Sequence, residues 1–149
     1  QEVTLTHNNS DRFENRWVHL KKDADSPCVW LKDVDLMESP IRHGEGNFIP
    51  RDDATLKKLE DSGCVALRYA TADGALANGE FPTNPNGSVG DIAGICDPSG
   101  RIFGLMPHPE AFIEPTNHPS WTRNDLLPSE GEGLQLFRNA VEYVKVNSL

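Results

Sequence analysis

Residues 100–112 have the sequence GRIFGLMPHPEAF, in which strand-forming residues lead to a histidine between two prolines. Each proline fixes its own φ angle and disfavours the helical region for the residue before it, so Met106 and His108 are predicted to be extended. Residues 102–106 are apolar on both faces, which is typical of a buried strand. The unit 107–110 is therefore expected to leave the C-terminal end of that strand without forming a helix, where open α/β sheets have their functional sites.

His108 and Glu110 are the candidate catalytic residues. In an extended chain, residues two apart share a face and lie about 7 Å apart at Cα, so the carboxylate is expected beside the imidazole. A carboxylate that accepts a ring N–H fixes the tautomer and leaves the other nitrogen free to take a proton from a nucleophile. The alternative is a histidine satisfied by a nearby carbonyl in a proline-rich loop, and the spacing alone does not separate the two.

The neighbouring segments predict a strand-rich domain. Residues 91–106 favour a β-hairpin, because Pro98 and Gly100 occupy positions that suit a type I turn. Alternating or apolar β-rich runs predict further strands before it. They are two strands in residues 12–33 around the turn-like DADSP, one near SPIRHGEGNFI at 39–49, and a buried one at 64–70.

Two helices and one long loop complete the prediction. Residues 51–63 have an aspartate start and Gly63 at the expected C-terminal cap. Residues 129–146 begin with a candidate capping box, Ser129 and Glu132, and carry one apolar face. That face consists of Leu134, Phe137, Val141 and Val144. The irregular residues 111–128, with three prolines and a tryptophan, are expected to form a functional loop.

Composition excludes several classes of protein. The formal charge of −9 and the pI near 4.9 argue against nucleic acid or an anionic membrane as a partner. There is no 18-residue apolar run and no signal peptide in the sequence. The three cysteines, Cys28, Cys64 and Cys96, form no C-x-x-C pair and indicate reduced thiols of a cytoplasmic protein. Cys96 comes closest to a nucleophile, but its place in a hairpin strand favours a core thiol.

A second His-x-Glu unit, His43 and Glu45, permits a metal-site hypothesis. A metal-dependent hydrolase could use these two residues together with His108 and Glu110. Against it, the sequence has no helical H-x-x-x-H, no cysteine pair, and no P-C-x-x-C of the zinc deaminases. The flanking glycines are explained more simply by a sharp turn.

The order of the elements indicates an incomplete architecture. Six or seven strands and two helices are predicted, with no β-α-β alternation in the first hundred residues. A buried parallel strand that ends in a site needs helix-linked neighbours, and few are present. The chain also lacks an initiator methionine, which is consistent with a processed chain or a fragment.

Residues 84–110, NPNGSVGDIAGICDPSGRIFGLMPHPE, carry a family resemblance. They resemble the C-terminal half of class I glutamine amidotransferases, most closely the glutaminase component of phosphoribosylformylglycinamidine synthase in purine biosynthesis. Three further stretches are similar to that family in the right order: LTHNNSDRFENRWV at 5–18, HGEGNF at 43–48 and GEGLQLFRNAVEYV at 131–144. The resemblance implies a flavodoxin-like α/β fold, of which residues 1–149 are the C-terminal part.

The resemblance also implies a Cys-His-Glu triad. His108 would be the base and Glu110 its orienting acid, while the cysteine would lie in an elbow of an N-terminal part expected before Gln1. Residues 1–149 would then be a single partial glutaminase domain, inactive alone. Two departures, Ala111-Phe112 in place of the usual continuation of HPE and a longer insert through NHPSWTR, affect local loop contacts.

The implied reaction is hydrolysis of glutamine, with the ammonia passing to a synthase subunit or domain. ATP and magnesium would bind to that partner, and no cofactor or metal is expected in this chain. Two further expectations remain. The chain could be a non-catalytic docking or regulatory module that retains the scaffold, and an apolar face left uncovered could cause self-association.

Overall fold

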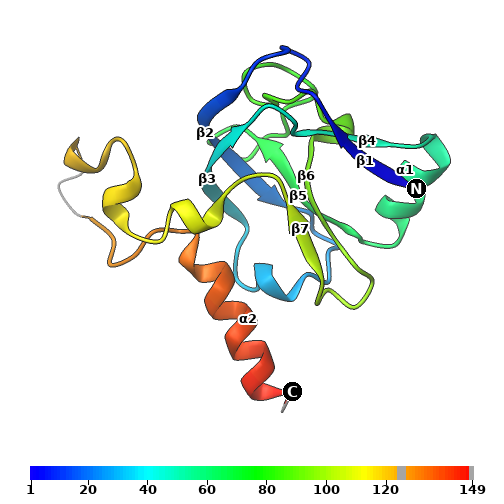
Figure 1. Cartoon of the computed structure of the whole chain (residues 1–149). Coiled ribbons are helices and arrows are strands. Elements are labelled where there is room, and N and C mark those ends of the chain that lie inside the picture. Colours follow the sequence, from blue (N-terminus) through cyan, green and yellow to red (C-terminus); the bar gives the residue numbers. More distant parts are fainter. Residues whose placement is uncertain (124–126, 148–149) are drawn as a thin grey trace.

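The computed structural model describes residues 1–123 and 127–147. This part of the chain is a mixed α/β structure, rich in strands and with two α-helices (Figure 1). In chain order the elements are β1 (Val3–Thr6), β2 (Glu14–Lys22), β3 (Leu36–His43), β4 (Asn47–Pro50), α1 (Asp53–Asp61), β5 (Val65–Ala70), β6 (Ile92–Cys96), β7 (Phe103–Leu105) and α2 (Leu134–Val146). Five short 3-10 helices lie between them: η1 (Val29–Leu31), η2 (Val89–Asp91), η3 (Pro109–Ala111), η4 (Pro115–Asn117) and η5 (Trp121–Arg123).

The main sheet has the strand order β3-β2-β5-β6-β7, and every pair in it is antiparallel. β1 and β4 form a separate antiparallel pair, which lies beside α1 (Figure 1). The predicted strand at 64–70 is confirmed as β5 in the centre of the sheet, where Leu67 and Tyr69 are fully buried. In β2, Val18 and Leu20 alternate into the same core, as the period of two predicts.

The hairpin prediction is confirmed by the pairing of β6 with β7. The amide of Gly100 donates to the Asp97 carbonyl across the turn at 2.8 Å, and Gly100 has φ +70°. The prediction of a strand buried on both faces is wrong. β7 is an edge strand of three residues in which Phe103 and Leu105 are half-buried, and Ile102 before it is 73% exposed.

The predicted strand in PCVWL is also wrong, since Val29–Leu31 form η1. The turn places Leu31 in the core with no exposed surface. It also leaves the Trp30 ring nitrogen free to donate to the Arg101 carbonyl at 3.0 Å. The predicted strand at 39–49 is two strands, β3 and β4, because the chain turns at Gly44–Gly46.

Helix α1 matches its sequence signals. The Asp52 side chain accepts from the Thr55 amide at 2.8 Å, which caps the first turn, and Gly63 with φ +67° follows the last one. Leu56 and Leu59 pack against a small apolar cluster of Phe48, Val65 and Ile92.

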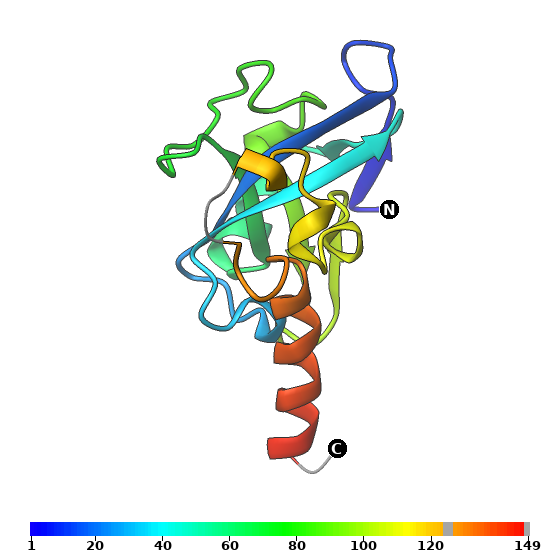
Figure 2. The same ribbon diagram turned by 90° about the vertical axis from the view of Figure 1, so that its left-hand side faces the viewer.

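Helix α2 differs from its prediction in two ways. It begins at Leu134 with Gly133 at the N-cap, which has no side chain to cap the first turn, and the Glu132 carboxylate of the predicted capping box accepts from the Glu38 amide at 2.6 Å instead. The helix extends away from the sheet (Figure 2). Leu136 and Asn139 are its buried residues. The amide group of Asn139 donates to the carbonyls of Trp30 and Lys32. The predicted apolar face is therefore largely exposed: Phe137 38%, Val141 53% and Val144 46%.

The described part of the 111–128 loop lies against β2 and β3 (Figure 2). Trp17 of β2 makes edge contacts with Phe112 and His118, with ring centroids at 4.9 and 4.5 Å. The His118 ring also pairs with Glu38 at 3.1 Å. Residues 124–126 of the predicted loop lie outside the described residues.

Candidate active site

His108 and Glu110 are in direct contact. Nδ1 of His108 lies 2.7 Å from Oε1 of Glu110, so the ring donates and the carboxylate accepts. This bond fixes the neutral tautomer with the proton on Nδ1 and the lone pair on Nε2. The His108 side chain is 36% exposed, and Nε2 makes no hydrogen bond within the described ranges. A ring held in this way can accept a proton at Nε2.

The backbone that forms this pair differs from the predicted extended chain. His108 is not helical, with φ −111° and ψ 78°, but Pro109–Ala111 form the 3-10 helix η3. The prediction that residues 107–110 avoid helical structure is therefore wrong from Pro109 onward. A proline fits the first position of such a turn because it has no amide hydrogen to leave unpaired.

Strand β3 holds His108 in place. The amide of His108 donates to the Pro40 carbonyl at 2.8 Å, which ties the residue to the edge of the sheet. His43 lies at the end of the same strand, and its ring centroid is 6.0 Å from that of His108 at an interplanar angle of 42°. The two histidines are thus brought together by tertiary structure over 65 residues of sequence.

His43 is buried, with 8% of its surface exposed. Its Nε2 accepts from the side-chain amide of Asn86 at 2.9 Å, which places the ring proton on Nδ1. Burial lowers the pKa of His43 below its usual value, because it disfavours the charged ring. His43 is therefore neutral near pH 7.

Two asparagines hold His43 from the other side. Asn86 also donates to Asn8 Oδ1 at 2.7 Å and accepts from the Tyr69 hydroxyl at 2.7 Å. The Asn8 side chain donates to the His43 carbonyl at 2.8 Å and accepts from the Gly46 amide at 3.0 Å. Asn8 and Asn86 are at most 1% exposed and bond within this network, whereas Nδ1 of His43 is buried without a hydrogen-bond partner in the described part of the chain.

Glu45 does not join His43. Its carboxylate lies 3.6 Å from Nδ1 of His7, and both side chains are exposed. Across the described ranges, no group of three or more His, Cys, Asp or Glu side chains could hold a metal ion. The four residues of the metal-site hypothesis are therefore divided: His108 contacts Glu110 and the ring of His43, whereas the carboxylate of Glu45 lies at His7.

The three cysteines are buried, as predicted. Burial raises the pKa of Cys28 to about 12 and raises that of Cys96 as well. Cys96 Sγ lies 3.6 Å from the Ser26 hydroxyl. Thiols of this kind are poor nucleophiles, so none of the three suits the role of partner to His108.

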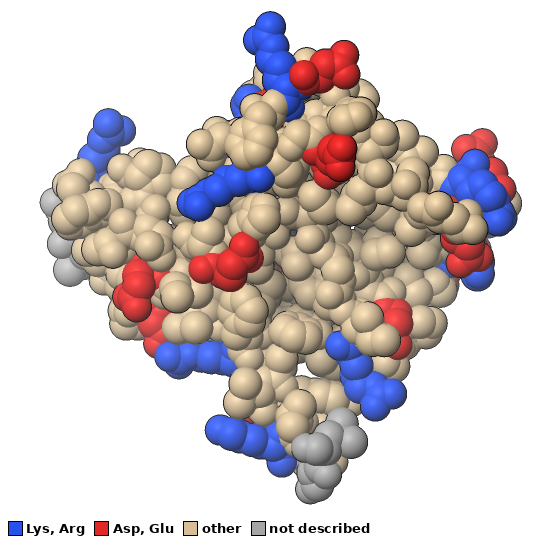
Figure 3. Space-filling view, in the orientation of Figure 1, with Lys and Arg blue, Asp and Glu red and all other residues tan. Residues whose placement is uncertain are grey.

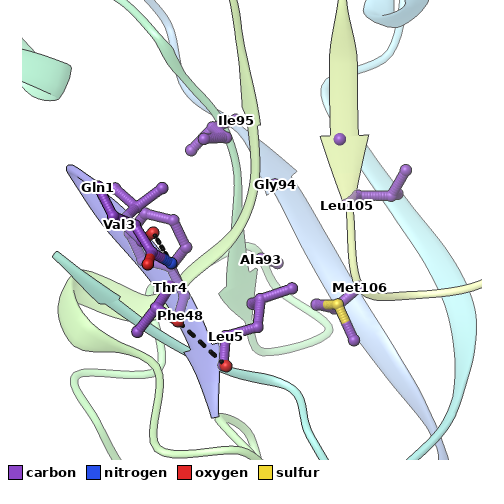
Figure 4. A pocket seen from close by; sticks show the side chains of 11 residues that line it. Gln1, Val3, Thr4, Leu5, Phe48, Ala93, Gly94, Ile95, Leu105 and Met106 are labelled. Carbon is purple, nitrogen blue, oxygen red and sulfur yellow. Dashed lines mark hydrogen bonds between the residues drawn. The ribbon is translucent and has the colours of Figure 1, made fainter.

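An apolar groove of about 410 Å³ lies between β1 and the β6–β7 hairpin (Figure 4). Leu5 and Phe48 face Ile95, Leu105 and Met106 across it. One lining residue, Met106, lies two positions before His108 in the chain, and the lining is mainly apolar. In the same orientation as Figure 1, charged side chains lie mainly around the rim of the molecule, and the middle of this face carries few of them (Figure 3).

Comparison with known proteins decides the family. Residues 1–144 match the family model of the CobB/CobQ-like glutamine amidotransferase domain. The chain belongs to this family. Among the glutamine amidotransferases that it resembles is the phosphoribosylformylglycinamidine synthase subunit PurQ of Methanococcus maripaludis, 45% identical over 93% of this chain and 54% of the relative. The same subunit of Dehalococcoides mccartyi is 43% identical over 97% of this chain and 54% of the relative.

The fold has a match of its own. The structure described as PurLQS from Thermotoga maritima aligns with a TM-score of 0.63 and 27% identity, over 97% of this chain and 54% of that one. The predicted α/β fold of a glutamine amidotransferase, rich in strands and with two helices, is therefore confirmed. The chain spans about half the length of the curated relatives it matches.

Sequence patterns did not indicate the contacts of three buried residues, His43, Asn8 and Asn86. They suggest His43 only as a metal ligand and contain the asparagines only within longer motifs. One signal could have indicated the network: NPNGS and HGEG each combine glycine with side chains able to donate and accept. Neither motif indicates that residues 84–88 and 43–46 lie next to each other in the folded chain.

Proposed function

We propose that this chain is the C-terminal part of the glutaminase subunit of phosphoribosylformylglycinamidine synthase, with His108 as the base and Glu110 as its orienting acid. The observation that carries the proposal is the 2.7 Å contact between them, which leaves Nε2 of a partly exposed imidazole ready for a proton. The family model, described as a glutamine amidotransferase domain, supports glutamine as the substrate, and the names of the relatives at 43–45% identity support the synthase.

The mechanism needs a thiol from the part of the relatives that this chain does not cover. His108 Nε2 would take the thiol proton as sulfur attacks the glutamine carboxamide carbon. The same proton would then pass to the departing nitrogen, which leaves as ammonia, and a thioester of glutamate remains. Water, deprotonated by His108, would hydrolyse the thioester and restore the thiol. Glu110 would stabilise the imidazolium form at each stage.

Partners and cofactors follow from the same assignment. The ammonia would be used by a synthase subunit or domain of the same enzyme, which would hold ATP and magnesium. The chain itself would bind neither ATP nor magnesium. We expect it to act in the cytoplasm. In the described ranges, no helix has the length and apolar composition needed to cross a membrane.

The apolar face of α2 supports a need for a second polypeptide. Phe137, Val141 and Val144 are exposed on one side of the helix, and Val146 beyond them is 74% exposed. We expect this chain alone to self-associate, and V141E to reduce the association. The control is K145Q, which changes the net charge by the same amount on the same helix. Light scattering that finds only monomer at high concentration would contradict the expectation.

The decisive experiment is reconstitution. The chain is co-expressed with the uncovered part of the Methanococcus maripaludis relative, and release of glutamate and ammonia from glutamine is measured. We expect activity from the combination and none from either part alone, and the activity should vanish when the cysteine of the added part is changed to alanine. A stable complex without activity would favour the docking-module alternative. Cysteine-dependent turnover by this chain alone would show that no second part is needed.

A further inference from the structure

His43 is a buried titratable side chain beside His108 that the mechanism above does not use. The centroid distance of 6.0 Å falls in the range of contacting aromatic pairs, about 4.5–7 Å. The two rings are tilted, with an interplanar angle of 42°. A second imidazole packed against the first calls for an explanation, because either charge would disfavour a charge on the other.

The orientation of His43 is fixed independently of His108. Asn86 donates to Nε2, Asn8 donates to the backbone carbonyl, and both asparagines are buried. Gly46 is required for this fit, since a Cβ added there would lie 2.2 Å from Nε2 of His43. The orientation of the His43 ring therefore does not depend on His108.

His108 is held far less firmly than His43. Its backbone amide is bound to Pro40, but its side chain makes one hydrogen bond in the described structure, to a Glu110 carboxylate that is 59% exposed. A solvent-exposed pair of this kind contributes little to stability, so the hydrogen bond that sets the tautomer restricts rotation of the ring only weakly. The ring of His43 is a second contact that can restrict rotation of the imidazole.

We propose that His43 is a positioning residue for His108: its neutral ring, fixed by Asn86, packs against the His108 imidazole and confines it to the orientation in which Nδ1 meets Glu110. The catalytic meaning of this role depends on the function proposed above. The lowered pKa of His43 fits the role, because a neutral neighbour does not oppose the imidazolium that His108 must form. The charged groups that bear on the pair are Glu110 of η3 and Glu14 of β2, which lies opposite His43 in the sheet.

Two substitutions separate positioning from a structural role. In His43→Gln the amide oxygen can still accept from Asn86, but the ring is lost. In His43→Phe the ring is kept, but the acceptor is lost. A residue that only satisfies Asn86 would tolerate the first change better, and a residue that positions His108 by packing would tolerate the second better.

The readout is the tautomer of His108 in the ¹⁵N-labelled 149-residue chain, measured near neutral pH by long-range ¹H–¹⁵N correlation. The wild-type chain is expected to hold His108 mainly as the Nδ1–H form. In His43→Gln that form should cease to predominate and the spectrum should approach that of an exposed histidine, whereas His43→Phe should retain it. His19→Gln, a change on β2, is the control and should leave His108 as in the wild type.

An unchanged His108 tautomer in folded His43→Gln overturns the proposal. If that variant does not fold, His43→Phe decides: a retained tautomer supports the proposal and a lost one overturns it. Failure of both variants to fold would make His43 a structural residue and would also overturn it. The measurement requires neither cysteine nor glutamine, so an inactive reconstituted glutaminase would refute the proposed function and leave this result standing.

Discussion

The two His-x-Glu units of this chain share a spacing and have opposite structures. At 108–110 the imidazole and the carboxylate are hydrogen-bonded at 2.7 Å, and both are accessible to solvent. At 43–45 the imidazole is buried against Asn86, while the carboxylate is exposed and lies 3.6 Å from His7. The same three-residue pattern therefore produces an exposed hydrogen-bonded pair in one place, and a buried imidazole separated from its carboxylate in the other.

The difference comes from the residues around each unit. Pro109 starts a 3-10 turn that brings Glu110 back toward His108. Gly44 and Gly46 instead let the chain reverse between β3 and β4, and the missing Cβ at Gly46 makes room for the His43 ring. Spacing sets which side chains could meet, and the backbone between them decides whether they do.

The largest expected effect is at His108. In the reconstituted glutaminase, His108→Ala should lower kcat by about 10⁴-fold, because general acid–base transfer is lost. His7→Ala is the control, since His7 is exposed and pairs with Glu45 instead. Initial rates of glutamate release measure both. An effect of the same size in the two variants would contradict a catalytic role that is specific to the 108–110 unit.

Glu110 should matter less, and only in its own unit. Glu110→Gln should lower kcat by about 100-fold, because the amide no longer stabilises the imidazolium of His108. Glu45→Gln is the matched change in the other unit and should change kcat by less than about twofold. Steady-state rates decide the matter, and a loss at Glu45 comparable to that at Glu110 would mean that both units act in the reaction.

The glycines of the HGEG turn provide a test of stability. A Cβ at Gly46 would lie 2.2 Å from His43 Nε2 and 2.5 Å from Asn86 Nδ2, whereas nothing lies within 4 Å of a Cβ at Gly44. Gly46→Ala should reduce the free energy of unfolding by about 2 kcal/mol through overpacking. Gly44→Ala should change it by less than about 0.5 kcal/mol. Urea denaturation of the 149-residue chain measures both. Equal losses would show that the glycines are required for the backbone of the turn and not for the space that the His43 ring occupies.

The smallest effect is the pH dependence due to His43. Because burial lowers its pKa in the folded state, the unfolded chain binds the proton more readily, and stability is lost as pH falls below the unfolded value of about 6.5. The wild type should therefore lose more stability than His43→Gln between pH 7.5 and pH 5.5. His19→Gln should keep the wild-type loss, because His43 is still present. Parallel curves for the wild type and His43→Gln in urea titrations would contradict a lowered pKa.

Sequence alone determined the elements whose signals are local. The alternation in β2, the aspartate cap and Gly63 of α1, and the turn of the β6–β7 hairpin each depend on residues within a few positions of one another. The pairing of His108 with Glu110 belongs to the same class, although a 3-10 turn forms it in place of an extended chain. The family resemblance was likewise present in the order of the motifs.

Tertiary structure decided what each side chain faces. The sequence predicted an apolar face on α2 but not its direction: Asn139 donates to the carbonyls of Trp30 and Lys32, and Phe137 and Val141 are exposed. His43 and His108 meet because β3 supplies both the Pro40 carbonyl and the His43 ring, and Asn86 fixes that ring from a loop 43 residues away. Local propensity depends on neighbours in the chain, whereas burial and orientation depend on segments distant in sequence, and no spacing rule contains that information.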